Sequence, residues 1–308
     1  MQKKYFFLAT LFFFSLSLMS QQTIQEKLGY PKNTKLLILH GDDIGVSHSQ
    51  NMASLTALGK GFISSGSIMV PCPWFPEVAA YAIAHPEADL GLHLTLTSEW
   101  KYYKWGPVAK DKAISLSNNK GFLYDDLDSL GKMAKLKEVE LELRAQIDRA
   151  IQFGIRPTHF DSHMAGCFFN KEYLKIYIQL AREYHVPCLL NREAFKVLFN
   201  INIDDLIVST DVLVDKVFMA YPNDYKQGMA NYYTKVISSL QPGLNCILLH
   251  AAYNDDEMQA VTIGHPDYGA AWRQADFDFF SSEACKKLLA DQNIHLITWK
   301  EIKEKLVK

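Results

Sequence analysis

The chain has 308 residues and a formal net charge of -2, and it is 48% hydrophobic and 21% charged. This is an ordinary globular composition without a basic tract, so it argues against nucleic acid or an anionic membrane surface as a partner. The five cysteines are odd in number and widely spaced, with no Cys-x-x-Cys. We therefore expect core thiols rather than disulfides, a structural zinc or a thiol nucleophile.

The first residues have the layout of a secretory signal peptide. Lys3 and Lys4 precede an apolar run from Tyr5 to Met19, and the chain turns polar at Ser20. The run is shorter than the roughly 20 residues that span a bilayer. We predict a signal peptide over residues 1–20, cleaved near Ser20 rather than retained as an anchor, and a mature protein over 21–308 that is periplasmic or secreted and free of the membrane.

Short apolar runs alternate with helical patterns along the rest of the chain. The predicted strands are Leu36–Leu39, Ser67–Val70, Leu90–Leu96, Thr158–Asp161, Pro187–Leu190, Lys216–Met219, Asn245–Leu249 and His295–Thr298. The predicted helices are His48–Lys60, Phe75–Ala84, Lys132–Phe153, Lys171–Tyr184, Ala230–Leu240 and Ser281–Gln292. A strand after each helix is typical of βαβ units, so we predict one α/β domain with seven or eight parallel strands in a TIM-like barrel rather than an open sheet.

Two segments differ from this regular alternation. Lys132–Phe153 is the clearest helix, because aliphatic residues recur in it at helical spacing and Gly154 marks its end. Trp100–Leu130 fits neither element and is rich in Tyr, Trp, Gly and Lys. We interpret it as a long insertion after a strand, of the kind that shapes substrate sites in barrels.

Two adjacent carboxylates are the most informative feature of the sequence. Asp42 and Asp43 follow the apolar run Leu36–Leu39 after His40 and Gly41. Acids at the end of a buried strand are costly without a positive partner, and a metal ion is the simplest partner. Adjacent side chains point in different directions, so one acid could bind a metal while the other faces a water or the substrate. The alternative is capping of the next helix, but a cap needs only one acid.

Histidines recur where the predicted strands end. His40, His93, His163 and His250 lie inside or just after strand candidates. Each one alone is more often a hydrogen-bonded structural residue. The carboxyl ends of parallel strands form barrel active sites, so the four histidines, Asp161 and the two adjacent acids indicate one shared site.

Individual roles follow from position. If the segment Thr158–His163 is extended, His163 is its last residue and the best ligand candidate, and Asp161 could orient it or a neighbour. His250 could donate a proton to a leaving group. Arg273 could hold a carboxylate or a substrate oxygen, or could lie on the surface of a helix. His40 either lines the site or holds the turn that follows it.

Four motifs make the chain resemble the YdjC-like carbohydrate deacetylases, which include chitooligosaccharide deacetylases. The motifs are His40–Gly45, Gly61–Met69, Gly91–Leu96 and Thr158–His163, and the similarity covers most of Lys35–Lys300. The resemblance implies a distorted (β/α) barrel as the catalytic domain over 21–308. It also implies hydrolysis of an N-acetyl group on a sugar.

Carried over by position, the resemblance implies one divalent metal ion held by Asp43, His93 and His163. Asp42 would be the general base and His250 the general acid. Mixed nitrogen and oxygen ligands do not select sharply among Zn, Mg, Mn, Co and Ni, and Zn and Mg are the first expectations.

The chain departs from the family pattern at two places. The family usually has Asp-Ser-His-x-His, whereas Met164 and Ala165 follow His163 here. The late element usually reads His-Pro, whereas Ala251 follows His250 here. Both departures leave the implied metal ligands intact and bear on the substrate and the acid.

The sequence therefore predicts a metal-dependent hydrolase that deacetylates an acetylated saccharide. One alternative is another metal hydrolase on the same barrel, such as an esterase or phosphoesterase. A second is a catalytically silent carbohydrate-binding protein. In a deacetylase or in a silent binding protein, the aromatic residues Trp100, Tyr102, Tyr103 and Trp105 would suit stacking on a sugar. The sugar and the oligomeric state, a homodimer included, stay open.

Overall fold

The structure is a computed structural model that describes residues 22–307, so the predicted signal peptide lies outside the described residues. The strands are β1 Lys35–Ile44, β2 Ser65–Ile68, β3 Leu90–Leu94, β4 Phe160–Ser162, β5 Lys216–Met219, β6 Gly243–Leu249 and β7 Ile294–Leu296. The main helices are α2 His48–Gly59, α3 Phe75–Ala84, α4 Leu127–Met133, α5 Leu136–Gln152, α6 Lys171–Glu183, α7 Arg192–Phe199, α9 Met229–Ser239, α11 Ala270–Phe280, α12 Glu283–Asp291 and α13 Trp299–Leu306. The short helices are α1 Ile24–Lys27, α8 Pro222–Gln227 and α10 Asp256–Val261.

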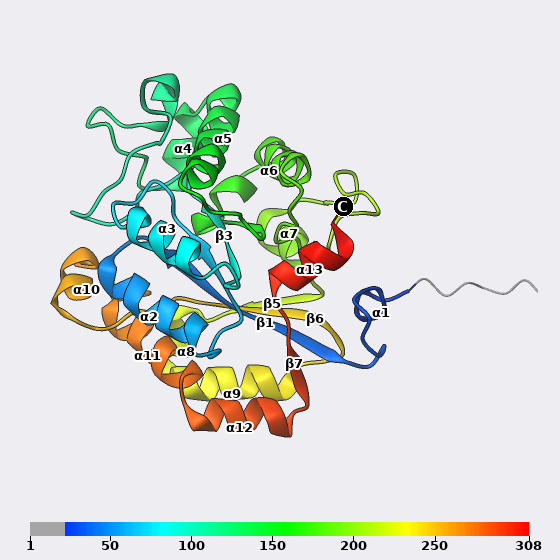
Figure 1. Cartoon of the computed structure of the whole chain (residues 1–308). Coiled ribbons are helices and arrows are strands. Elements are labelled where there is room, and N and C mark those ends of the chain that lie inside the picture. Colours follow the sequence, from blue (N-terminus) through cyan, green and yellow to red (C-terminus); the bar gives the residue numbers. More distant parts are fainter. Residues whose placement is uncertain (1–21, 308) are drawn as a thin grey trace, which may run out of the picture.

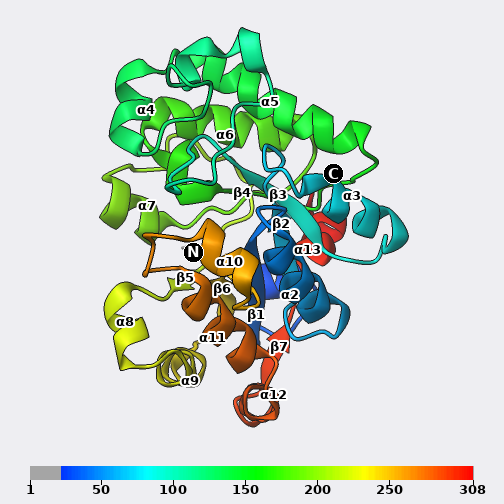
Figure 2. The same ribbon diagram turned by 90° about the vertical axis from the view of Figure 1, so that its left-hand side faces the viewer.

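The strands form one parallel sheet in the order β4-β3-β2-β1-β6-β5, and β7 also pairs with β1. In both views the strands lie between α4 and α5 at one end of the molecule and α9 and α12 at the other (Figure 1, Figure 2). The prediction of a single α/β domain with a distorted barrel of parallel strands is confirmed.

The predicted strand Pro187–Leu190 is only a bridge in the structure. Phe160 N donates to the Pro187 carbonyl at 3.0 Å, and Leu189 N donates to the Phe160 carbonyl at 2.9 Å. Val214 N in turn donates to the Leu190 carbonyl at 2.9 Å. Because proline has no N–H to donate, the ladder cannot extend regularly through this segment. These few bonds nevertheless connect β4 with the segment that leads into β5.

The predicted helix Lys132–Phe153 is two helices, α4 and α5. Ala134 and Lys135 are extended between them, with ψ of 130° and 132°. Lys135 N donates to Ser115 Oγ at 2.9 Å. A tertiary hydrogen bond to the insertion therefore takes the place of a helical one, which local periodicity could not show.

Helix α5 holds the insertion and the end of β3 in place. The buried Glu142 carboxylate accepts from Val108 N and Ala109 N at 2.9 and 2.8 Å. The Gln146 amide bridges the N–H and carbonyl of Thr95 at 3.0 and 2.6 Å. The predicted insertion Trp100–Leu130 has two short 3-10 turns and is otherwise mostly irregular, but its last residues, from Leu127, form the start of α4. It is thus fixed to the residues that follow β3, next to the candidate site.

The core follows the predicted alternation. Leu92 and Leu94 are fully buried on one face of β3, and Leu96, just after the strand, is fully buried as well. The five cysteines are buried free thiols, in keeping with core positions. Among residues 22–307, no helix combines the length and the hydropathy that crossing a membrane requires.

Candidate active site

Strand β1 delivers both predicted carboxylates through an irregular end. It continues past the predicted boundary at Leu39, and its register against β2 shifts between Gly41 and Ile44. Asp43 has φ of 60°, a left-handed conformation that Asp tolerates better than most residues. A bulge of this kind re-aims side chains. Both acids consequently lie 4.0 Å from the same atom, Nε2 of His250.

Capping does not explain the two acids. The N-cap of α2 is Ser47, whose Oγ accepts from Gln50 N at 3.1 Å. The capping alternative is therefore wrong for Asp42 and Asp43.

The predicted metal ligands converge. Asp43 Oδ1 lies 3.1 Å from His163 Nδ1 and 3.3 Å from His93 Nε2, and the three side chains are buried. Two atoms that each lie about 2.1 Å from one ion are roughly 3.0–3.4 Å apart at octahedral or tetrahedral angles. The donor set and its spacing therefore fit a divalent ion, and these three residues could hold one.

Asp161 orients His93 rather than His163. Its Oδ1 lies 2.9 Å from His93 Nδ1, an ion-pair contact that lacks good hydrogen-bond geometry, and its Oδ2 accepts from Ser67 Oγ at 2.9 Å. Burial favours the neutral acid, but the neighbouring imidazoles of His93 and His40 hold the pKa of Asp161 below its ordinary value. A carboxylate on the far nitrogen fixes the orientation of a ligand imidazole.

His40 does more than hold a turn. Its Nε2 lies 3.0 Å from Asp161 Oδ2 and 3.5 Å from Asp42 Oδ1, and its Nδ1 lies 3.1 Å from Ser65 Oγ. It connects the candidate base with the carboxylate that orients His93. His159 lies deeper, edge-on to His40 at 4.9 Å between ring centroids.

Arg273 is 3% exposed, so its predicted alternative position on a helix surface is wrong. Its Nη2 donates to Asp43 Oδ2 at 2.8 Å, and its Nη1 donates to Gln50 Oε1 at 3.0 Å. Its Nε donates to the Tyr268 carbonyl at 2.7 Å. Burial opposes ionisation of Asp43, but Arg273 and the two imidazoles hold its pKa well below the usual range. The carboxylate that Arg273 was predicted to hold is thus that of Asp43.

Asp42 is the less satisfied of the two acids. Among residues 22–307, its Oδ1 has no hydrogen-bond partner of good geometry. Burial raises the pKa of Asp42 to about 7. An acid whose pKa lies near neutrality can take up and release a proton at working pH, which suits a general base.

His250 follows β6, as predicted, and faces both acids. Its backbone N donates to Asp276 Oδ2 at 3.0 Å, and its ring lies edge-on to Tyr268 with 5.6 Å between centroids. Burial and the neighbouring Arg273 lower the pKa of His250 to about 3, so the imidazole is neutral before any reaction.

Three residues of the site were missed from the sequence. Glu99 follows β3 and lies 3.0 Å from His163 Nε2 through its Oε2. Asp276 supports His250, and Tyr268 supports Arg273. The strand-end rule that found the histidines also covers Glu99. The three-residue spacing of Arg273 and Asp276 on one helix was the signal for Asp276.

The aromatic insertion is mostly packed away from solvent. Trp105 is 2% exposed, its ring centroid lies 6.0 Å from that of His163, and its Nε1 donates to the Thr97 carbonyl at 2.8 Å. Trp100 is likewise buried, with the Arg273 guanidinium 5.4 Å from its ring. Stacking of a sugar on Trp105 is therefore excluded in this conformation, and Trp105 supports His163 instead. Tyr102, at 73% exposure, is the open ring of the group.

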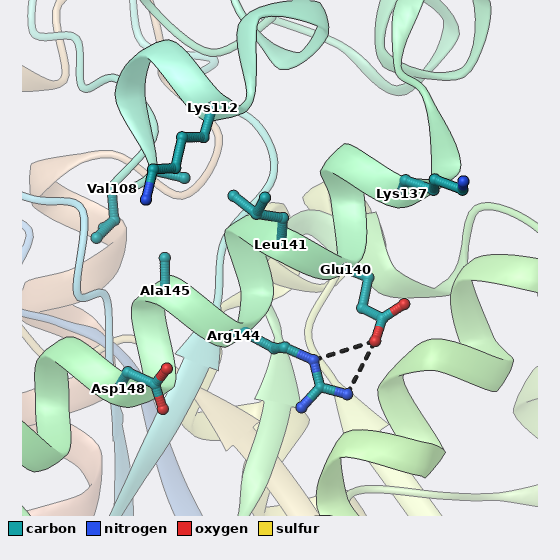
Figure 3. Close-up of a pocket in the computed structure, with 9 residues that line it drawn as sticks. Val108, Lys112, Lys137, Glu140, Leu141, Arg144, Ala145 and Asp148 are labelled. Carbon is teal, nitrogen blue, oxygen red and sulfur yellow. Dashed lines mark hydrogen bonds and ion pairs between the residues drawn. The ribbon is translucent and has the colours of Figure 1, made fainter.

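A separate hollow on the outside of α5 contains none of these residues (Figure 3). Arg144 Nη2 pairs with Glu140 there at 2.8 Å, and its Nη1 pairs with Glu183 at 2.6 Å. The charge of Arg144 is thus neutralised by two neighbouring glutamates. The candidate catalytic residues lie elsewhere, at the ends of the strands.

The fold and the site together define a single-domain (β/α) barrel with a buried Asp-His-His group at the carboxyl ends of its parallel strands. The family model described as YdjC-like protein matches residues 36–291. The chain therefore belongs to the YdjC-like family.

Curated relatives over nearly the whole length are named carbohydrate deacetylase. The relative from Thermus thermophilus is 31% identical over 285 residues, covering 91% of this chain and 98% of the relative. The relative from Brevibacillus brevis is 29% identical, covering 86% of this chain and 99% of the relative. A solved structure from Enterococcus faecalis, described as a cellobiose-phosphate cleavage protein, has a TM-score of 0.71 at 22% identity, covering 87% of this chain and 99% of that one. That last likeness concerns the fold.

Proposed function

We propose that this protein is a metal-dependent carbohydrate deacetylase that hydrolyses the acetyl group of an N-acetylated saccharide. The convergence of Asp43, His93 and His163 beside a second, less satisfied carboxylate carries the proposal. The name shared by the whole-length relatives supports the same reaction class.

In this proposal the three ligands hold one divalent ion. A bound ion of this kind brings the pKa of water toward about 7 and stabilises negative charge on a carbonyl oxygen. Arg273 keeps Asp43 ionised and fixed, and Asp161 keeps His93 turned toward it. The chain thus supplies a rigid donor set before the substrate arrives.

Asp42 accepts a proton from the attacking water as the oxygen of that water bonds to the acetyl carbon. The C–N bond then breaks, and the leaving nitrogen takes up a proton, giving acetate and a free amine. Because His250 starts neutral, it acts as the acid only after it receives a proton. Its Nε2 lies 4.0 Å from Asp42 Oδ2, which places it to relay the proton that Asp42 has taken. Acid–base assistance of this kind contributes roughly 10²–10⁴-fold.

The test combines metal analysis with acetate release. The mature protein is stripped with a chelator, reloaded separately with Zn, Mg, Mn, Co or Ni, and assayed on N-acetylated and O-acetylated saccharides. We expect metal-dependent acetate release from an N-acetylated saccharide. Release from O-acetylated sugars alone would favour an esterase, and sugar binding without any release would favour a silent binding protein.

The base is tested separately with Asp42→Asn. The variant should keep the metal and lose roughly 10²–10⁴-fold in turnover. Asp125→Asn is the matched control, because Asp125 is an exposed acid paired with Lys104 on the insertion. A near-normal rate for Asp42→Asn would show that another group is the base.

We further propose that residues 1–20 direct export. Cell fractionation with N-terminal sequencing of the purified protein tests this. A new N-terminus near Ser20 in the periplasm or medium is expected. An intact N-terminus in the membrane fraction would favour the anchor, and one in the cytoplasm would overturn the proposal.

A further inference from the structure

The two candidate ligand imidazoles face Asp43 with different nitrogens. His93 turns its Nε2 toward Asp43 Oδ1 at 3.3 Å and its Nδ1 toward Asp161 at 2.9 Å. His163 turns its Nδ1 toward Asp43 Oδ1 at 3.1 Å and its Nε2 toward Glu99 Oε2 at 3.0 Å. Each imidazole therefore lies between Asp43 and a carboxylate of its own.

The local chain does not by itself hold the His163 ring. Met164 and Ala165, which follow it, both have left-handed backbone conformations, with φ of 47° and 57°. Such conformations persist in residues with a Cβ only where the surroundings impose them. The polar contacts of the ring are Asp43 and Glu99, and the rings of Trp105 and His93 pack edge-on beside it.

The Glu99 carboxylate lies where it can hold the His163 ring in place. Its side chain is 13% exposed, and His163 is the partner that its carboxylate contacts. A carboxylate on the far nitrogen fixes the tautomer of a ligand imidazole and makes its near nitrogen more basic.

We propose that Glu99 is a positioning residue that holds His163 with Nδ1 toward Asp43 and thereby sets the metal affinity of the site. The inference rests on the proposed metal-dependent function, and it names Nδ1 of His163 and Nε2 of His93 as the ligand atoms. Asp161 then positions the His93 imidazole, and Glu99 positions the His163 imidazole.

The test measures metal binding without any turnover. Apo protein is titrated with Mn²⁺ alone by calorimetry. Glu99→Ala should weaken binding about 10–100-fold, which is the usual effect of removing such a partner. Glu99→Gln, which keeps an acceptor oxygen, should weaken it less. Asp161→Asn is the matched variant at the other imidazole, and Asp125→Asn is the exposed control.

Two further readouts separate positioning from a general structural role. Thermal unfolding of the apo Glu99→Gln variant, which keeps an acceptor oxygen, should stay close to that of the parent. In the Zn²⁺-loaded protein, the ¹⁵N shifts of the imidazoles should show coordination by Nδ1 of His163 and Nε2 of His93.

The outcomes are distinguishable. Unchanged Mn²⁺ affinity in Glu99→Ala, or coordination by Nε2 of His163, would overturn the role of Glu99 and leave the deacetylase proposal standing. A parent protein that binds none of the divalent ions would overturn both.

Discussion

Two halves of the chain build the site in different ways. The strand-borne half, from β1, β3 and β4, is a closed set of side-chain contacts in which Asp161 joins His93 and His40. The late half, from β6 and α11, also uses backbone groups. The His250 N–H is bound by Asp276, and the Arg273 Nε binds a backbone carbonyl.

The two halves meet at Asp43. Its Oδ1 faces the imidazoles of the strand-borne half, and its Oδ2 accepts from Arg273 of the late half. The difference suggests a division of work. In the proposed reaction, the strand-borne half would hold the metal and supply the base Asp42, and the late half would keep Asp43 charged and supply the acid His250.

The largest effect is expected where the halves meet. Asp43→Asn should abolish Mn²⁺ binding and reduce acetate release to background. It also leaves the buried Arg273 without its countercharge, so the free energy of unfolding should fall by roughly 3–5 kcal/mol in urea titrations. Asp291→Asn, which breaks an exposed pair with Lys287, should cost less than about 1 kcal/mol. Equal losses in the two variants would mean that the halves are not coupled through Asp43.

Next in size is a change confined to the late half. His250→Gln should lower turnover by roughly 10²–10⁴-fold and leave Mn²⁺ affinity unchanged. Steady-state acetate release and calorimetry measure the two quantities independently. A parallel loss of metal affinity would show that His250 belongs to the donor set, and the division between the halves would then fail.

A pH-dependent effect comes from Asp276. Burial raises the pKa of Asp276 to about 7, whereas the pKa of an unfolded Asp is about 3.9. The stability that the neutral acid contributes is complete below the unfolded pKa and is lost as pH rises toward the folded one. The stability of the parent relative to Asp276→Asn should therefore fall by a few kcal/mol between about pH 4 and pH 7 and then level off. Urea unfolding across that range tests this, and a difference that grows with pH would show the opposite shift.

The smallest effect is expected at Tyr268. Its Oη donates to the Ala220 carbonyl at 3.0 Å, so Tyr268→Phe should lower the free energy of unfolding by about 1 kcal/mol. Metal affinity should not change, because Tyr268 meets the site through its backbone carbonyl and its ring. Tyr102→Phe, on an exposed ring, is the control. A weakened metal affinity in Tyr268→Phe would show that metal binding also depends on the late half.

Much of the strand-borne half could be predicted from the sequence. The apolar run before Asp42 and Asp43, and the alternation around His93, are local patterns with a direct physical cause. Buried strands need apolar residues, and parallel strands collect their end residues at one rim. The parallel barrel and the gathering of strand-end acids and histidines at one rim follow from these patterns, whereas the choice of three candidate ligands among them came from the family resemblance.

Only the tertiary structure decided which side chains contact one another. Arg273 and Asp43 are 230 residues apart, and Glu99 and His163 are 64 apart. No local period links such pairs, because the packing of distant elements brings them together. The same reason explains the break between α4 and α5 and the burial of Trp105, each imposed by a contact from another element. The sequence determined the chemical groups at the rim, and packing determined their partners, their charges and their orientation.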